Sequence, residues 1–356
     1  MSRGLGDVYK RQEMVARTWR DLEWTGQRVP KQGIDHAVLI LDGLHSKEYE
    51  LNDMLPESVV VRVPFEKEYR EQAMLESSLI AQLFRRTKVR VPGTVRQAYA
   101  RGTFNTAEPV MLTMQTELLG EPLTAELWQT LSTSQRAWVA EQLGSLLATM
   151  HAFDPDVLPM SRVDSWWTDG EATSELNNAP RTLPGKLELM KSRTETILAP
   201  HLSAAEAEFV ERVFAQVDEL ISRPEQQRAL THGELHEDHM LWNAEGGVGV
   251  IDFSDMTVGD PALDYAHFAG IAPELPKMVY EQAIIQHEQR RQAPVVPGVP
   301  QPMPGPLYRA PDGGRTSESA EDTGVLRRAE VYKDWDNIFL LIDHYRTGRS
   351  PRMELL

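Results

Sequence analysis

One short segment of the chain is dense in side chains that can do chemistry. Residues 231–243 read THGELHEDHMLWN and place three histidines and three acidic residues between His232 and His239. Zinc needs three or four nitrogen or carboxylate ligands and an open position for water. Glu234, His236, Asp238 and His239 resemble such a set, although a metallo-β-lactamase-like site has histidine where Glu234 stands. A zinc hydrolase is therefore one hypothesis for this loop.

The same segment also fits phosphoryl transfer, which needs an acid to orient the attacking hydroxyl and a carboxylate to hold magnesium against nucleotide phosphates. The run GVGVIDF (247–253) predicts a strand, and Asp252 near its end lies eighteen residues beyond Glu234. The run GDPALD follows at 259–264. A loop acid and a strand-end aspartate on adjacent segments supply both groups, so we favour phosphoryl transfer.

The combined run HGELHEDHMLW…VIDFSD…GDPALDYA resembles the signature of the aminoglycoside phosphotransferase family, which has a protein-kinase-like fold. The family's loop reads His-Gly-Asp, with asparagine five residues after the aspartate. Here Glu234 stands at the acid position and His239 at the asparagine position. Histidine there resembles the 2″-aminoglycoside and macrolide phosphotransferase branches, which often favour GTP over ATP. We expect His232 to be structural, and the role of His236 stays open.

The resemblance implies a role for each matched residue. Glu234 is the catalytic group that orients or deprotonates the acceptor hydroxyl, and His239 and Asp252 lie at the magnesium ion. Asp260 and Asp264 are implied to be structural, capping and anchoring the segment behind the loop. Glutamate at position 234 adds one methylene to the family's aspartate and moves the carboxylate by about 1.5 Å, a displacement large enough to slow a reaction.

A second pair of charges supports this hypothesis from the N-terminal third. The run VVVRV (59–63) places Arg62 as the one charge in an otherwise apolar predicted strand, and a buried guanidinium needs an ionic partner. At about 100° per residue, the apolar stripe of the next predicted helix is centred on Glu76, and Glu71 lies near the opposite face. The residues within about 80° of Glu76 are Tyr69, Ala73, Leu79, Ile80, Leu83 and Phe84. The resemblance points to the same pair, with Arg62 holding nucleotide phosphates.

The run VMLTMQTELLGEPL (110–123) resembles the hinge of kinase-like proteins. The resemblance implies that residues 115–117, which include Gln115 and Glu117, present backbone groups to the purine of the nucleotide. No glycine-rich loop joins the first two predicted strands, where only Gly33 and Gly43 are near. ATP and GTP both stay open as donors.

The elements needed to position these residues predict an α+β chain with two unequal lobes. We expect a leader over 1–29, whose first twelve residues look like a non-native remnant, an N-lobe over 30–117 and a C-lobe over 118–356. The resemblance implies a small antiparallel sheet in the N-lobe and a larger, mainly helical C-lobe. Proline-rich residues 293–325 predict a flexible insertion. The predicted strands are 36–41, 59–63 and 110–114, and the predicted helices are 66–84, 135–151, 204–221 and 327–346.

Composition narrows the class of protein and of partner. With 41% hydrophobic and 25% charged residues, the chain is typical of a soluble globular protein, and it has no apolar run of about 20 residues. We expect a cytoplasmic location. The net charge of −16 argues against nucleic acid and anionic membranes as partners, and it suits either a cationic ligand or a merely solvated surface. The absence of cysteine excludes disulfides and thiolate metal sites.

These features lead to one main hypothesis: Mg²⁺-dependent transfer of the γ-phosphate of ATP or GTP to a hydroxyl of a small, cationic molecule. An aminoglycoside antibiotic is the first candidate acceptor, followed by a macrolide or a metabolite alcohol. Residues 164–175 and 333–337 combine tryptophan with carboxylates and could bind a polyamine sugar, or could be core and solvated surface. A catalytically degenerate, kinase-like binding protein is the alternative from another class.

Overall fold

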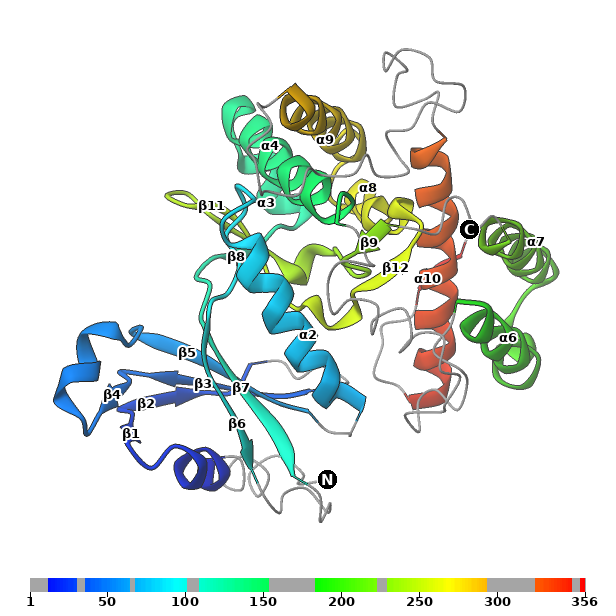
Figure 1. The fold of residues 1–356 in the computed structure, drawn as a ribbon. Coiled ribbons are helices and arrows are strands. Elements are labelled where there is room, and N and C mark those ends of the chain that lie inside the picture. The colour runs from blue at the N-terminus through cyan, green and yellow to red at the C-terminus, as the bar shows by residue number, and fades with distance from the viewer. Residues whose placement is uncertain are drawn as a thin grey trace. The chain divides into compact units, whose positions relative to one another are not determined.

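The protein folds into two compact units in the computed structural model (Figure 1). Unit 1 comprises Met1–Arg85 and Arg90–Leu119, and unit 2 comprises Arg86–Val89 and Gly120–Leu356. Unit 1 is built around an antiparallel sheet and unit 2 is mainly helical, which confirms the α+β class. The residues that the structure describes are 12–30, 36–64, 68–100, 109–153, 183–222, 229–292, 324–347 and 353–355.

The main sheet of unit 1 is antiparallel, with strand order β2-β3-β5-β7-β6. Its strands are β2 (Gly26–Arg28), β3 (His36–Asp42), β5 (Ser58–Pro64), β6 (Thr94–Ala100) and β7 (Val110–Thr116). The helix α2 (Glu68–Leu83) contacts β6 and β7. The remaining elements are β1 (Leu22–Glu23), which pairs with β4 (His45–Ser46), and the 3-10 helix η1 (Tyr49–Met54).

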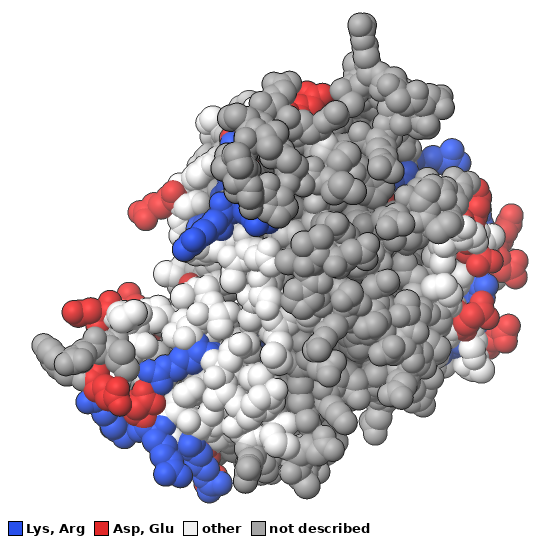
Figure 2. Space-filling view, viewed as in Figure 1, with Lys and Arg blue, Asp and Glu red and all other residues white. Residues whose placement is uncertain are grey.

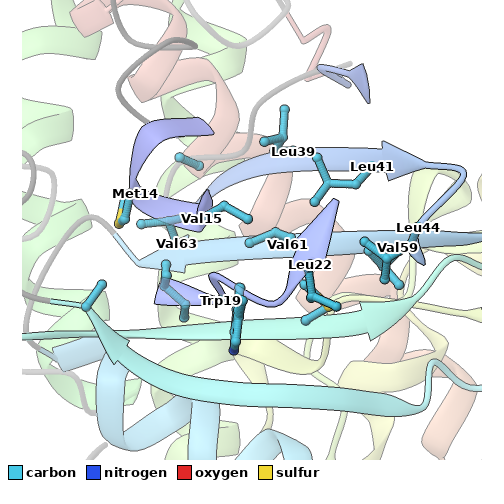
Figure 3. Close-up of a cluster of buried hydrophobic side chains, with 14 residues drawn as sticks. Met14, Val15, Trp19, Leu22, Leu39, Leu41, Leu44, Val59, Val61 and Val63 are labelled. Carbon is cyan, nitrogen blue, oxygen red and sulfur yellow. The ribbon is translucent and has the colours of Figure 1, made fainter. Parts of the chain in front are cut away.

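Alternation of side chains along β5 gives the sheet two different faces. Val59, Val61 and Val63 are fully buried in one apolar cluster, and the residues between them point to the opposite face. A helix over residues 12–18 and the turn after it add Met14 and Trp19 to this cluster (Figure 3). The described part of the predicted leader is therefore folded into unit 1, and residues 1–11 lie outside the described residues.

Unit 2 is built from helices that pack closely enough to exclude side chains at some positions. A Cβ added at Gly144 of α4 would lie 2.6 Å from Gln282 Cβ of α9, so glycine permits this close approach. Ser203 and Glu206 form the predicted capping box of α7. The helices are α3 (Ala125–Thr130), α4 (Thr133–Met150), α6 (Leu183–Arg193), α7 (Ala204–Ile221), α8 (Phe268–Ile271), α9 (Leu275–Gln292) and α10 (Val325–Thr347), with the π-helical turn η2 (Thr194–Leu198) and the 3-10 turn η3 (Ala199–His201).

Short strands and 3-10 turns in unit 2 frame the histidine-rich loop. The strands are β8 (Glu121–Pro122), β9 (Ala229–Thr231), β10 (Met240–Asn243), β11 (Gly247–Val250) and β12 (Thr257–Gly259). They form an antiparallel β11-β10-β8 sheet and a β12-β9 pair. The 3-10 turns are η5 (Glu237–His239), η6 (Phe253–Asp255) and η7 (Pro261–Tyr265).

The long predicted elements are present, with shifts at their ends. The predicted strand over 247–253 ends at Val250, so Asp252 follows the strand instead of belonging to it. The helix predicted to 84 ends at Leu83, and the side chain of Phe84 is 64% exposed, contrary to its place on the predicted apolar stripe. Of the predicted insertion, residues 293–323 lie outside the described residues.

Part of the negative charge lies on one exposed helix. Figure 2 shows acidic side chains gathered at the right-hand edge, where Figure 1 places α6 and α7. On α7, Glu208, Glu211, Asp218 and Glu219 are exposed. These carboxylates are exposed to solvent, so part of the net negative charge belongs to a solvated surface and is not evidence for a cationic ligand. Among the described helices, none has the length and apolarity needed to cross a membrane.

Candidate active site

The histidine-rich loop is anchored by one buried carboxylate. Asp264, fully buried in η7, accepts hydrogen bonds from the backbone N–H of His232 (3.2 Å) and of Gly233 (2.9 Å). Nε2 of His151, at the end of α4, lies 2.9 Å from the same carboxylate. Hydrogen bonds of this kind to a buried charge are the strong ones. The geometry confirms the anchoring role predicted for Asp264.

Asp260 holds the other end of this segment. Its carboxylate accepts a hydrogen bond from the backbone N–H of Ala262 (2.9 Å) and so caps η7. The same carboxylate accepts from Nε of Arg328 in α10 at 2.8 Å. Asp260 is fully buried, and this pairing with a guanidinium satisfies its charge. Its predicted structural role is also confirmed.

Two residues at the start of the loop fix its conformation. Gly233 has φ +85°, and a Cβ there would lie 2.4 Å from the backbone oxygen of Asp255. His232 is fully buried; Nε2–H donates to the oxygen of Ile251 (3.2 Å), and Nδ1 accepts from the backbone N–H of Glu234 (3.3 Å). Burial lowers the pKa of His232 to about 4, so the ring is neutral near pH 7. His232 is structural, as predicted.

His239 lies between two carboxylates. Its Nδ1 donates to the backbone oxygen of Glu234 (2.9 Å), and the Glu234 carboxylate oxygen is 3.7 Å from the same nitrogen. On the other edge of the ring, Nε2 lies 3.8 Å from the carboxylate oxygen of Asp252. The three residues that the sequence assigned to catalysis and to magnesium are therefore neighbours in the fold.

Asp252 is held in an unusual backbone conformation. With φ 60° and ψ 72°, it is the one non-glycine residue of the described chain with positive φ. Aspartate tolerates this left-handed region better than most residues, but the conformation still costs free energy and is typical of functional sites. Its carboxylate accepts a hydrogen bond from the Ser254 hydroxyl (2.6 Å), and its side chain is 37% exposed.

The environment of Glu234 is strongly acidic. Burial of the carboxyl group and the negative charges of Asp255, Asp336 and Asp252 raise its pKa well above the ordinary value. Solvent still reaches 44% of the side-chain surface, which lessens the effect of burial on this pKa. The carboxylate of Asp336, on α10, also lies 3.6 Å from Nε2 of His267.

His236 packs against His239 beside this acidic group. The ring centroids are 3.9 Å apart with an angle of 35° between the planes. Nδ1 of His236 accepts a hydrogen bond from the backbone N–H of Asp238 (3.3 Å), which caps η5. Burial and the neighbouring imidazoles lower the pKa of His236 to about 3. His236 is therefore neutral near pH 7, and its ring packs closely against that of His239 without charge repulsion.

In unit 1, Arg62 and Glu76 form the predicted ion pair. Nη1 of Arg62 donates to the carboxylate of Glu76, and the two side chains are only 8% and 3% exposed. Nη2 of Arg62 also lies 3.4 Å from Nδ1 of His36. Arg62 points to the face of β5 opposite the valine cluster, and Glu76 is on the buried stripe of α2. Glu76, at the centre of the predicted apolar stripe, is thus the partner of Arg62, as predicted.

The predicted hinge residues lie at the end of β7. The side chain of Gln115 is buried, and its Nε2 has no hydrogen-bond partner within the described residues. The carboxylate of Glu117 binds the guanidinium of Arg28 from β2, with distances of 2.7 and 3.0 Å. The backbone N–H of Glu117 makes a long bond of 3.4 Å to the oxygen of Ser58.

The donor atoms fit a magnesium ion at Asp252 better than at His239. Magnesium takes oxygen ligands, and a half-exposed carboxylate next to the loop supplies one. The imidazole nitrogen of His239 is better suited to transition metals. By donor chemistry, the Asp252 carboxylate therefore suits a magnesium ion better than the His239 ring does.

Comparison with known proteins identifies the family. A model described as "Phosphotransferase enzyme family" matches residues 36–294, more than half of the chain. The chain belongs to this family. Viomycin phosphotransferase of Streptomyces vinaceus is 38% identical over 78 residues, which are 21% of this chain and 25% of that protein. The chain thus matches only a quarter of the length of this curated relative.

Solved structures show that the phosphotransferase fold extends over nearly the whole chain. The GDP and kanamycin complex of APH(2″)-IIIa has a TM-score of 0.63 at 16% identity, covering 95% of this chain and 93% of that one. The apoenzyme of macrolide 2′-phosphotransferase MphH from Brachybacterium faecium has a TM-score of 0.50 at 18% identity, covering 95% and 92%. The resemblance inferred from the sequence motifs is confirmed.

Sequence reasoning missed the role of two acids and left one candidate region open. Asp255 was visible in the run VIDFSD, and Asp336 in KDWDN, but nothing in either run showed that they approach Glu234. Trp335, in the same KDWDN run, is 3% exposed and belongs to the core of unit 2. Residues 164–175, the other candidate contributors to the acceptor pocket, lie outside the described residues.

Proposed function

We propose that this phosphotransferase moves the γ-phosphate of ATP or GTP to a hydroxyl of a small cationic molecule, in a magnesium-dependent reaction. The observation that carries the proposal is the grouping of Glu234 and Asp252 on either side of His239, at 3.7 and 3.8 Å. Phosphoryl transfer requires little covalent chemistry from the protein beyond a positioned acid and electrostatic stabilisation.

In this proposal, each part of the reaction falls to a named residue of this chain. Glu234 orients the acceptor hydroxyl and takes its proton, and Asp252 holds magnesium, which when bound neutralises charge on the nucleotide phosphates. Arg62 binds nucleotide phosphates and is oriented by Glu76. The backbone near Gln115 and Glu117 contacts the purine, where the buried Nε2 of Gln115 is a further available donor.

The acidic surroundings of Glu234 favour a cationic acceptor. Burial of Glu234, together with Asp255, Asp336 and Asp252, raises the pKa of its carboxyl group and so opposes the ionised form that a proton acceptor needs. Ammonium groups on the acceptor would offset these negative charges and lower the pKa again. An aminoglycoside carries such groups, and the structural relatives include complexes with kanamycin and gentamicin. This favours an aminoglycoside over a macrolide.

A nucleotide-consumption screen tests the proposal. The purified protein is incubated with magnesium and either ATP or GTP, alone and with aminoglycosides, macrolides or amino alcohols. We expect acceleration by at least one polycationic acceptor and a phosphorylated product in its mass spectrum. Nucleotide use that no acceptor accelerates above background would contradict the proposal.

A binding protein without turnover is the second candidate, favoured by glutamate at position 234 in place of aspartate. Glu234→Asp separates the two functions. If the longer side chain misplaces the base, the variant gains activity; if the loop has adapted to glutamate, activity stays equal or falls. Silence in both forms, together with saturable nucleotide binding, would establish the binding protein.

A further inference from the structure

The catalytic loop also contains a set of side chains suited to a different metal. Glu234, His236 and His239 each offer one ligand atom, and these three atoms lie within 4.8 Å of one another. Zinc lies about 2.0–2.2 Å from each of its ligand atoms, so the three side chains have to bring these atoms to within about 4.4 Å of one another. The two imidazoles come from one turn of the chain, since His236 is the N-cap of η5 and His239 is its last residue.

His239 is oriented as metal-binding histidines usually are. Its Nδ1–H donates to the backbone oxygen of Glu234 at 2.9 Å. This bond fixes the tautomer and leaves the lone pair on Nε2, as is typical of ligating histidine. Because the Glu234 carboxylate lies 3.7 Å from Nδ1, it has to move toward Nε2 to share an ion there, where the Asp252 carboxylate is 3.8 Å away. The His239 side chain is 15% exposed, so it is largely held in place by its surroundings.

His236 requires only a small rearrangement to bind the same ion as His239. The Nδ1 atom of His236 accepts a hydrogen bond from the N–H of Asp238 at 3.3 Å, which is long for an N–H donor. A metal ion at Nδ1 replaces this bond, and an ion at Nε2 moves the ring proton to Nδ1 and abolishes it. Either way, one weak hydrogen bond is lost for one coordinate bond.

We propose that Glu234, His236 and His239 bind a first-row transition-metal ion, with Zn²⁺ as the probe, and that this ion inhibits phosphoryl transfer. Two imidazoles and a carboxylate are a donor set that favours zinc over magnesium. The metal site is independent of the reaction. Its inhibitory effect rests on the proposed function, because zinc engages the carboxylate that receives the proton of the acceptor.

Zinc binding is tested first without nucleotide or acceptor. Zn²⁺ alone is titrated into the full chain in competition with a chelating dye, for the wild type and for His236→Ala and Glu234→Gln. We expect one site, with affinity reduced at least about tenfold in each variant, since even outer-shell changes at metal sites cost this much. His45→Ala is the control, because it removes an exposed histidine 3.1 Å from Glu23 that belongs to no set of three.

Asp252→Asn distinguishes the proposed site from the magnesium position. The variant should keep its zinc affinity if the ligands are the proposed three. Zinc binding lost in Asp252→Asn but retained in His236→Ala would overturn the assignment, as would equal losses in His45→Ala. Thermal melting of each variant shows whether it is folded. If His236→Ala does not fold, Glu234→Gln takes its place in the test.

Inhibition is tested separately with the acceptor found by the screen. Zinc should inhibit at concentrations that match its affinity, chelation should restore the rate, and His236→Ala should need at least about tenfold more zinc. Zinc binding without any active acceptor would contradict the proposed function and leave the metal site standing. A fully active enzyme with zinc bound would overturn the inhibitory role.

Discussion

The two groups of charges that the sequence singled out are built in opposite ways. The Arg62–Glu76 pair in unit 1 is almost completely buried, and each charge is neutralised by the other. In unit 2, Glu234 and Asp252 are 44% and 37% exposed and face further carboxylates. The buried pair is complete within the protein. The loop brings several carboxylates together, and bound cations would offset their mutual repulsion, so we expect its chemistry to depend on ligands.

The largest effect should come from a change in the exposed acidic group of unit 2. Glu234→Gln keeps the size of the side chain but removes its capacity to accept a proton, so kcat should fall roughly 100- to 10,000-fold. The measurement is steady-state phosphorylation of the acceptor from the screen. Unchanged nucleotide affinity in a binding titration is the control for folding. A loss smaller than about threefold would show that Glu234 is not the base, because general bases contribute far more.

For the buried Arg62–Glu76 pair, the main effect of a substitution should be on the free energy of unfolding. Glu76→Leu leaves the Arg62 guanidinium buried without its partner, and breaking such a pair costs about 3–5 kcal/mol. Urea unfolding of the single and double variants measures this cost. The double variant Arg62→Met/Glu76→Leu should recover most of it, since neither charge is then left alone. Additive losses would mean that the two side chains do not act as a pair.

Buried His232 should make the stability of the loop region depend on pH. Its pKa is about 4 in the folded protein, against an ordinary value of 6.5. The unfolded chain therefore takes up a proton between these values that the folded chain does not, so stability is fully present above pH 6.5 and falls towards pH 4. The difference corresponds to about 3 kcal/mol.

Unfolding curves of the wild type and of His232→Asn between pH 4 and 7 isolate this contribution. The wild type should lose stability relative to the variant as the pH decreases. Parallel pH profiles for the two proteins would contradict the neutral, buried state of His232.

The smallest expected effect concerns the backbone of the loop. Gly233→Ala forces a side chain into φ +85° and against the oxygen of Asp255, and strain of this kind costs about 1–3 kcal/mol. Gly270→Ala on α8 is the matched control, because a Cβ there meets nothing within 4 Å and alanine favours a helix by up to about 1 kcal/mol. Melting temperatures should move in opposite directions for the two variants.

The sequence predicted local patterns well and tertiary proximity poorly. Glu76 was identified because its charge interrupts a helical apolar stripe, and Asp252 and His239 because their spacing matches a known motif. Phe84 was placed on the same stripe wrongly, since the helix ends one residue earlier. The helix over 12–18 was missed because its apolar side chains gain their partners only from the sheet. Asp336 approaches Glu234 from about 100 residues away, which no local pattern can reveal.

The way Asp264 anchors the loop has a consequence for how this site can change over generations. The carboxylate accepts hydrogen bonds from the backbone N–H groups of His232 and Gly233, and these two bonds do not involve a side chain of the loop. Acid length at that position can therefore drift between aspartate and glutamate while the scaffold that presents it stays intact. The backbone conformation of the loop thus does not depend on which acid stands at position 234. A substitution there can change the reaction with the acceptor without changing the shape of the loop.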